Sequence, residues 1–370
     1  MDTLDQINAL LNQPNTFQRN LEQLVLLSQK FVSLYEAPGC DNGDGSLSDE
    51  LRPMLATMSD PSATIPVEME LILSSILKIL LRKSSNRLAL GKAGMTSILR
   101  SLNRILTERN IKATAELCNA VLNTCYDGVN VQFLIELDGV SLLMKLLNSR
   151  DTELITSALG ALQGLCYEPR GRQSVRQDLK VSIKTSYFIH RQLLSRFSSA
   201  FGSQAIPKIA TFLSNENEHV RARAVGAVHN LSVDVVSIAP LVECRCIPAL
   251  VVLLRDPSIE ICRAATGTIQ NLSRDISVRA SIVDSGALDY LSDLLFANDI
   301  TCQVKPSLCV SIATVDMRKL SSSIHSQVAA VGTILNIVGS SLKTPEEHQQ
   351  LRQTLSDGVA LGAIRSCVFD

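Results

Sequence analysis

A motif of nine residues recurs five times along the chain and limits its fold more than any other feature. The copies are NAVLNTCYD, GALQGLCYE, GAVHNLSVD, GTIQNLSRD and GTILNIVGS. The fifth residue of each copy defines what we call the ladder: Asn123, Gly164, Asn230, Asn271 and Asn336. Recurrence of this kind predicts a chain built from stacked copies of one supersecondary unit.

A second motif accompanies the first and indicates what each repeat contains. Its copies include AGMTSILRSL, DGVSLLMKLL, RCIPALVVLL and SGALDYLSDLL. Each repeat then has a short helix, a turn marked by Gly or Pro, and a longer helix with apolar residues at i, i+3, i+4 and i+7. One repeat cannot bury such an apolar face alone, whereas stacked neighbours can. The sequence therefore predicts an all-α solenoid.

The two motifs in register resemble the armadillo repeat, a unit of about 42 residues with three helices. Residues 216–234 and 245–275 carry the resemblance most clearly, and it extends over most of residues 68–370. The resemblance implies an armadillo-repeat right-handed superhelical solenoid of about six to seven repeats. In this family the third helix of each repeat lines a concave groove.

Two repeats are longer than the others. The ladder advances by 41 positions from Asn123 to Gly164 and from Asn230 to Asn271, but by 66 and 65 positions in the other two steps. Removing residues 181–204 restores a step of 42 positions, and removing residues 304–327 restores a step of 41. Both segments have the same length, begin with Val and end with Gln. They are therefore insertions in the repeat array.

The insertions have the properties expected of translated introns. Val codons begin with GT and one Gln codon is CAG, which match the two ends of spliced introns, and 24 codons preserve the reading frame. One alternative is a pair of surface loops, which solenoids accommodate at low cost. Another, for the first insertion only, is an amphipathic binding element containing Arg191 and Arg196.

The N-terminal region differs from the array over residues 67–370. Residues 1–36 have an amphipathic pattern that predicts one or two helices capping the first repeat. Residues 37–66 are rich in Gly, Ser, Asp and Pro, which predicts a flexible loop. Within this loop residues 40–51 resemble an EF-hand, but Cys40 and Leu51 occupy its first and last ligand positions. We therefore expect no calcium site.

Composition excludes several classes of function. The chain has 35 basic and 36 acidic residues, so its net charge of −1 gives no reason to expect nucleic acid or an acidic membrane as a partner. No apolar run reaches 18 residues and the acidic N-terminus does not resemble a secretory signal, so we expect no membrane span or leader. Ten cysteines without a C-x-x-C pair indicate reduced, buried thiols in a cytoplasmic or nuclear protein.

No catalytic motif is present. The chain lacks a Gly-rich phosphate loop and a G-x-S-x-G sequence. Cys244 and Cys246, taken with the histidines at 219 and 229, match no zinc signature. His229 itself is expected to be a structural or surface residue. We therefore expect a non-enzymatic protein with no catalytic residue, no metal and no cofactor.

The resemblance also implies a binding surface. In armadillo proteins the recurring Asn lies on the concave surface and hydrogen-bonds the backbone of an extended peptide, because its amide is both donor and acceptor. Arg223, and with an offset of one residue Arg263, favour an acidic partner. The alternative is that the Asn residues only fix local contacts between helices. The groove residues predicted in this way are Asn123, Asn230, Asn271, Asn336, Arg223 and Arg263.

The branch of the family is indicated by what precedes each ladder residue. In importin-α a Trp lies four residues before each Asn, whereas this chain has no Trp and no basic N-terminal tail. Its Gly- and Ala-rich motifs resemble instead the scaffold branch, such as β-catenin or vacuolar armadillo proteins. We expect a protein-binding scaffold, with a membrane- or cytoskeleton-associated structural protein as the alternative. The positions corresponding to Trp are Asn119, Gly160, Gly226, Gly267 and Gly332.

The intron interpretation predicts that most transcripts of this gene lack the codons for residues 181–204 and 304–327. Sequencing full-length cDNA tests it directly. Transcripts shorter by 72 nucleotides at each place are expected, since each insertion has 24 codons. If all full-length transcripts encode both segments, the insertions are surface loops instead.

Overall fold

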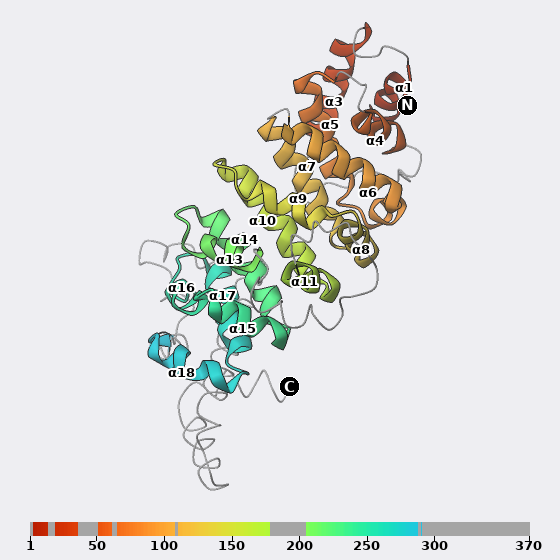
Figure 1. Cartoon of the computed structure of the whole chain (residues 1–370). Helices are drawn as coiled ribbons and strands as arrows, with labels where there is room; N and C mark the ends of the chain where they lie inside the picture. The colour runs from red at the N-terminus through yellow and green to blue at the C-terminus, as the bar shows by residue number, and fades with distance from the viewer. Residues whose placement is uncertain are drawn as a thin grey trace, which may run out of the picture. The chain divides into compact units, whose positions relative to one another are not determined.

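The computed structural model describes residues 3–13, 19–35, 51–60, 65–107, 110–177, 205–287 and 290. Within these residues all regular structure is helical, as predicted. The chain forms two compact units, Met1–Ala205 and Ile206–Asp370, whose helices are labelled in Figure 1. Neither insertion nor the last ladder residue, Asn336, lies within the described residues.

The first compact unit contains ten described helices. They are α1 (Thr3–Leu11), α3 (Leu21–Tyr35), α4 (Leu51–Ser59), α5 (Val67–Leu80), α6 (Ser84–Thr107), α7 (Ile111–Thr124), α8 (Gly128–Glu136), α9 (Gly139–Leu146), α10 (Thr152–Tyr167) and α11 (Pro169–Arg176). Helices α8, α9 and α10 are the first, second and third helices of one repeat. In the repeat before it, α6 bends at Gly91 and supplies both the first and second helices, and α7 is the third.

The second compact unit contains the described helices that follow. The one exception is Ala205, the first residue of α13, which belongs to the first unit. These helices are α13 (Ala205–Ala210), η1 (Thr211–Ser214), α14 (Glu218–Ser232), η2 (Val235–Ser237), α15 (Ile238–Glu243), α16 (Cys246–Leu253), α17 (Ile259–Leu272) and α18 (Ile276–Asp284). Helices α14 and α17 are third helices of successive repeats. One complete repeat runs from η2 through α15 and α16 to α17.

The third helices pack directly on one another within each unit. Helix α7 contacts α5 on one side and α10 on the other, and α14 contacts α17. The side chains between them are aliphatic and fully buried, including Leu117 and Val121 of α7 and Leu159 of α10. Burying one such side chain contributes about 1.5–3 kcal/mol. Stacking of third helices is therefore the main source of stability in the array.

Short polar side chains cap the N-termini of three third helices, α7, α10 and α14. Asn110, Asp151 and Asn217 each accept a hydrogen bond from the backbone N–H three residues later, at 3.3, 2.9 and 3.2 Å. These N–H groups have no partner within the helix, so a cap of this kind typically contributes about 1 kcal/mol. The same chemistry at the same place in three repeats fixes the register of the third helices.

Arginines of the first helices cap the C-terminal ends of the preceding third helices. Arg87, Arg172 and Arg279 each donate to a carbonyl six residues earlier, at the end of the preceding third helix, over 3.2, 3.2 and 2.7 Å. The last carbonyls of a helix lack intrahelical partners, and a cation there also opposes the negative end of the helix dipole. These contacts define the turn from a third helix to the next repeat.

The region expected to be a flexible loop, residues 37–66, differs from that expectation. Helix α4 occupies Leu51–Ser59 and contacts α1 and α6. Met54 and Met58 are fully buried, so their apolar spacing outweighs the polar composition around them. Residues 1–36 include α1 and α3, and their proposed role as a cap stays a prediction.

A left-handed residue marks the turn between first and second helices. Asp138 has a φ of 59° before α9, Arg245 a φ of 56° before α16, and Gly286 a φ of 74°. Gly286 follows Arg245 at the same interval at which Asn271 follows Asn230, so this turn recurs in step with the ladder. Only Gly adopts this conformation without steric cost.

Replacing Arg245 by Gly is expected to stabilise the protein by about 1 kcal/mol, because it relieves the left-handed strain. Arg245 is exposed, so little packing is lost. Urea unfolding measures the change, and Arg245→Ala is the control that removes the side chain but keeps Cβ. Equal stability of the Gly and Ala variants would show that the turn carries no strain.

Candidate functional site

The ladder position faces the preceding third helix in the repeats where its contacts are described. Asn123 of α7 donates from Nδ2 to the carbonyl oxygen of Lys78 on α5, at 2.8 Å. Asn271 of α17 donates from Nδ2 to Oγ of Ser232 on α14, at 2.9 Å. A Cβ at Gly164 would lie 3.0 Å from Cβ of Cys125, at the end of α7. Each of these ladder residues is thus a contact between successive repeats.

The inter-repeat bond uses only part of each amide. Asn123 and Asn271 are half-buried, and no described residue donates a hydrogen bond to Oδ1 of either one. One N–H and Oδ1 of each amide remain. These are the donor and the acceptor that would pair with the C=O and the N–H of a peptide backbone. Asn230 is half-buried at the matching place of α14. The bond to the preceding helix therefore fixes the orientation of the amides of Asn123 and Asn271 and leaves one donor and one acceptor of each without a partner among the described residues.

The ladder contact in the second unit continues into α14. Ser232 is fully buried, accepts from Asn271, and donates from Oγ to the carbonyl oxygen of His229 at 2.7 Å. Hydrogen bonds in such a chain restrain each other's orientation. The side chain of Asn271 and the backbone at His229 are therefore coupled across two repeats.

His229 lies against Gly267, which explains why no large residue is present there. A Cβ at position 267 would lie 2.8 Å from Cε1 and 3.2 Å from Nδ1 of the imidazole. Gly267 is a position that the sequence resemblance aligns with a Trp of importin-α, and in this structure the imidazole of the neighbouring helix covers it. No sequence pattern marks this contact beyond the Gly itself, since ring placement depends on packing between repeats.

Burial and a neighbouring cation keep His229 neutral. Desolvation lowers the pKa of His229, and the Arg263 guanidinium lowers it further. Nδ1 is buried and has no hydrogen-bond partner among the described residues. The imidazole is therefore uncharged near neutral pH.

The two predicted arginines are exposed on neighbouring third helices. Arg223 belongs to α14 and Arg263 to α17, one residue out of register as the sequence indicated. In the first unit, by contrast, Lys78 of α5 pairs with Glu116 of α7 at 2.7 Å. The two arginines thus place cationic charge on the third helices of the second unit.

The described cysteines are unsuited to nucleophilic chemistry. Burial raises the pKa of Cys125 and of Cys246 to about 12, so both remain thiols at neutral pH.

Over the described part of the chain, no group of three His, Cys, Asp or Glu side chains could hold a metal ion. Among these residues no single helix is long and apolar enough to cross a membrane, and one bent pair, Val235–Glu243 with Cys246–Leu253, meets the length and composition requirements together.

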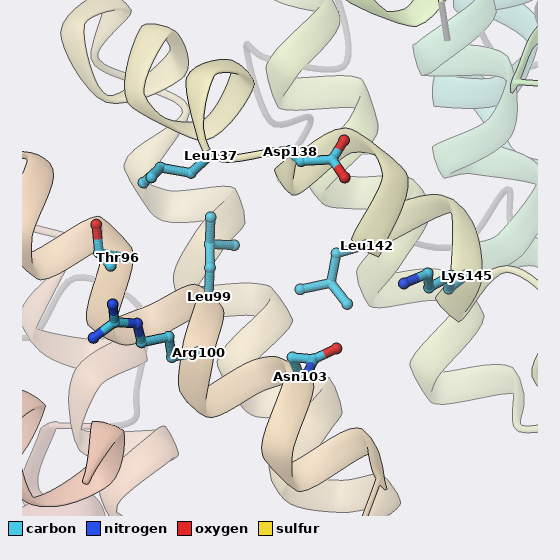
Figure 2. Close-up of a pocket in the computed structure, with 8 residues that line it drawn as sticks. All are labelled: Thr96, Leu99, Arg100, Asn103, Leu137, Asp138, Leu142 and Lys145. Atoms are coloured by element: carbon cyan, nitrogen blue, oxygen red, sulfur yellow. The ribbon is translucent and has the colours of Figure 1, made fainter. Parts of the chain in front are cut away.

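Two cavities lie away from the third helices. The one in Figure 2, of about 390 Å³, is formed by the second half of α6, by the turn that follows α8 and by α9. Leu99, Leu137 and Leu142 line it together with the polar residues Thr96, Arg100, Asn103, Asp138 and Lys145. The other, of about 490 Å³, lies among α8, α9 and α11. Neither includes a predicted groove residue.

Repeated triplets of helices, stacked through their third members, define an α-helical repeat protein. The family model of the armadillo/β-catenin-like repeat matches residues 129–167 and 237–274, which correspond to α8–α10 and to the repeat ending in α17. The chain therefore contains armadillo repeats, and its fold is an all-α armadillo-repeat array. No curated protein matches the sequence significantly.

Solved structures with a similar fold include designed armadillo repeat proteins. One designed armadillo repeat protein is 18% identical with a TM-score of 0.57, covering 77% of this chain and 98% of its own. Computationally designed armadillo repeat proteins for modular peptide recognition give 18% identity and a TM-score of 0.54, over 75% and 98%. A third, in complex with the peptide (KR)4, gives 17% and 0.51, over 88% and 99%. At these identities the similarity establishes the fold alone.

Proposed function

We propose that the chain is a non-enzymatic scaffold that holds an extended peptide segment of a partner protein along its third helices. The observation that carries the proposal is the orientation of the ladder amides. Asn123 and Asn271 are each held by the preceding repeat through one N–H. Their remaining donor and acceptor can pair with a peptide backbone without reading its side chains.

A binding position that recurs in each repeat suits the holding of an extended peptide. A peptide in extended form advances about 3.3 Å per residue, so successive repeats contact successive parts of one segment. Each contact is weak alone, since a net hydrogen bond contributes about 0.5–1.5 kcal/mol, but contacts at fixed spacing add along the segment. Designed proteins with this fold support the idea, since one of them was solved in complex with the peptide (KR)4.

The missing Trp residues favour the scaffold branch over nuclear import. Stacking of basic cargo side chains needs aromatic faces, and Gly267 is instead covered by His229. We place the protein in the cytoplasm, in keeping with the described cysteines, which are all free thiols and, apart from the half-buried Cys244, buried.

Replacing both Asn230 and Asn271 by Ala is expected to weaken capture of partner proteins from a cell extract about tenfold, because two peptide hydrogen bonds are lost. Quantitative mass spectrometry of proteins bound to the full chain measures the change. The matched control is Asn103→Ala with Asn148→Ala, two exposed asparagines that lie off the third helices. An unchanged set of partners in the Asn230/Asn271 variant, with its fold intact by circular dichroism, would rule out the groove.

A further inference from the structure

The turns that lead into α8 and α11 each present an exposed tyrosine. Tyr126 follows the ladder residue Asn123 by three positions, and Tyr167 follows Gly164 by the same interval. The two tyrosines are 73% and 72% exposed, and neither hydroxyl makes a hydrogen bond with a described residue. An aromatic ring with a free polar tip is common where proteins meet their partners. Here two such rings occupy equivalent places in successive repeats.

Stacking of the repeats sets the distance between the two tyrosines. Helices α7 and α10, which end at or just before them, pack on each other, and the first helices α8 and α11 that follow are also in contact. Packed helices lie about 8–10 Å apart, so the two tyrosines start from backbones separated by about that distance. A polyproline II helix has three residues per turn and advances about 9.3 Å per turn. Prolines three positions apart in such a segment can therefore contact successive rings.

A carboxylate lies between the two tyrosines. Glu168 follows Tyr167 directly, and its side chain extends back to the start of α8. A Cβ at Gly128 would lie 3.6 Å from Cδ and 3.7 Å from Oε2 of Glu168. Gly128 is itself only two residues after Tyr126. No described residue donates a hydrogen bond to this carboxylate or forms an ion pair with it. The carboxylate is therefore open to a cationic partner.

Three other charged side chains near the tyrosines are already engaged. Asp127, the counterpart of Glu168 one repeat earlier, accepts from two backbone N–H groups as the cap of α8, at 2.9 and 3.2 Å. Arg170 donates to a glutamine side chain of α8. Arg87 lies over the ring of Tyr126, with Cζ at 5.8 Å from the ring centroid, and donates to a carbonyl at the end of the preceding third helix. The contact with Arg87 also restrains the ring, which lowers the entropy lost on binding.

We propose that Tyr126, Tyr167 and Glu168, which we call the tyrosine edge, bind a proline-rich segment of a partner protein in the polyproline II conformation. Prolines spaced three apart pack on the two rings. The tyrosine hydroxyls donate to backbone carbonyls of the segment, which are free because a polyproline II helix has no internal hydrogen bonds. A lysine or arginine beside these prolines pairs with Glu168.

The tyrosine edge goes beyond the proposed peptide groove, because the two surfaces select different backbones. A ladder amide pairs with both the C=O and the N–H of a peptide, and proline has no N–H. The tyrosine edge needs only carbonyls and ring contacts, so it accepts a segment that the ladder binds poorly. The equivalent positions in the second unit are Val233 and Arg274, which are not aromatic.

Fluorescence anisotropy with three labelled peptides and the full chain tests this inference. The peptide (Pro-Pro-Arg)3 is expected to bind about tenfold more tightly than either of two controls. One control, (Gly-Ser-Arg)3, keeps the charge but not the polyproline II backbone. The other, (Pro-Pro-Glu)3, keeps the backbone and reverses the charge. Equal binding of (Pro-Pro-Arg)3 and either control would contradict the inference.

Variants assign the binding to the tyrosine edge. Changing both Tyr126 and Tyr167 to Ala is expected to weaken (Pro-Pro-Arg)3 binding about tenfold, because both ring contacts are lost. Glu168→Gln is expected to weaken it about threefold, as for an exposed ion pair. The matched control is Val235→Ala with Ile276→Ala, which removes two exposed apolar side chains from the corresponding turns of the second unit. This control is expected to bind as the unchanged chain does, and circular dichroism checks the fold of every variant.

The remaining outcomes distinguish the tyrosine edge from other surfaces and occupants. If the tyrosine variant is folded and binds (Pro-Pro-Arg)3 normally, the inference is wrong. If binding is lost instead in the Asn230→Ala/Asn271→Ala variant, the segment lies in the groove, and only the proposed function stands. If analytical ultracentrifugation shows a dimer of the unchanged chain and a monomer of the tyrosine variant, a second copy covers the tyrosine edge and the inference is also wrong.

Discussion

Contact between successive third helices is the interaction on which the rest of this structure depends. A single helix such as α7 has apolar residues on two sides and buries them only because α5 and α10 flank it. The caps at Asn110, Asp151 and Asn217 and the arginines that close each third helix fix the register in which this stacking occurs. The ladder residues are placed by the same register, so their chemistry follows from the stacking.

The proposed peptide binding by the ladder asparagines is compatible with a role in fixing local contacts between helices. Asn123 and Asn271 do fix local contacts, because each donates to the preceding third helix. That contact uses one N–H and restrains the amide, which lowers the entropy lost when a second partner binds. At the ladder position Gly164 there is no room for an amide side chain, since even a Cβ there would crowd Leu122 and Cys125. Local fixation and peptide binding are thus compatible wherever the amide has room.

Much of the fold was predictable because it depends on spacing. The regular step of the ladder located the repeats, and the structure has third helices where the ladder motif lies, from α7 to α17. Helix α4 was missed because two buried methionines outweigh a polar, Gly-rich context. His229 was expected to be a structural or surface residue, but its particular contact was not predicted, for a different reason. Its contact with Gly267 joins residues of two different repeats, and no local pattern encodes the orientation of a ring between repeats.

Asn123 and Asn271 are each held by the preceding repeat, and a double-mutant cycle between Asn271 and Ser232 tests this most directly. Each residue is changed to Ala singly and together, and urea unfolding gives the four free energies of unfolding. A coupling free energy of about 0.5–1.5 kcal/mol is expected, since the cycle isolates one partly buried hydrogen bond. Changes that are additive within about 0.3 kcal/mol would show that the preceding repeat does not hold the amide.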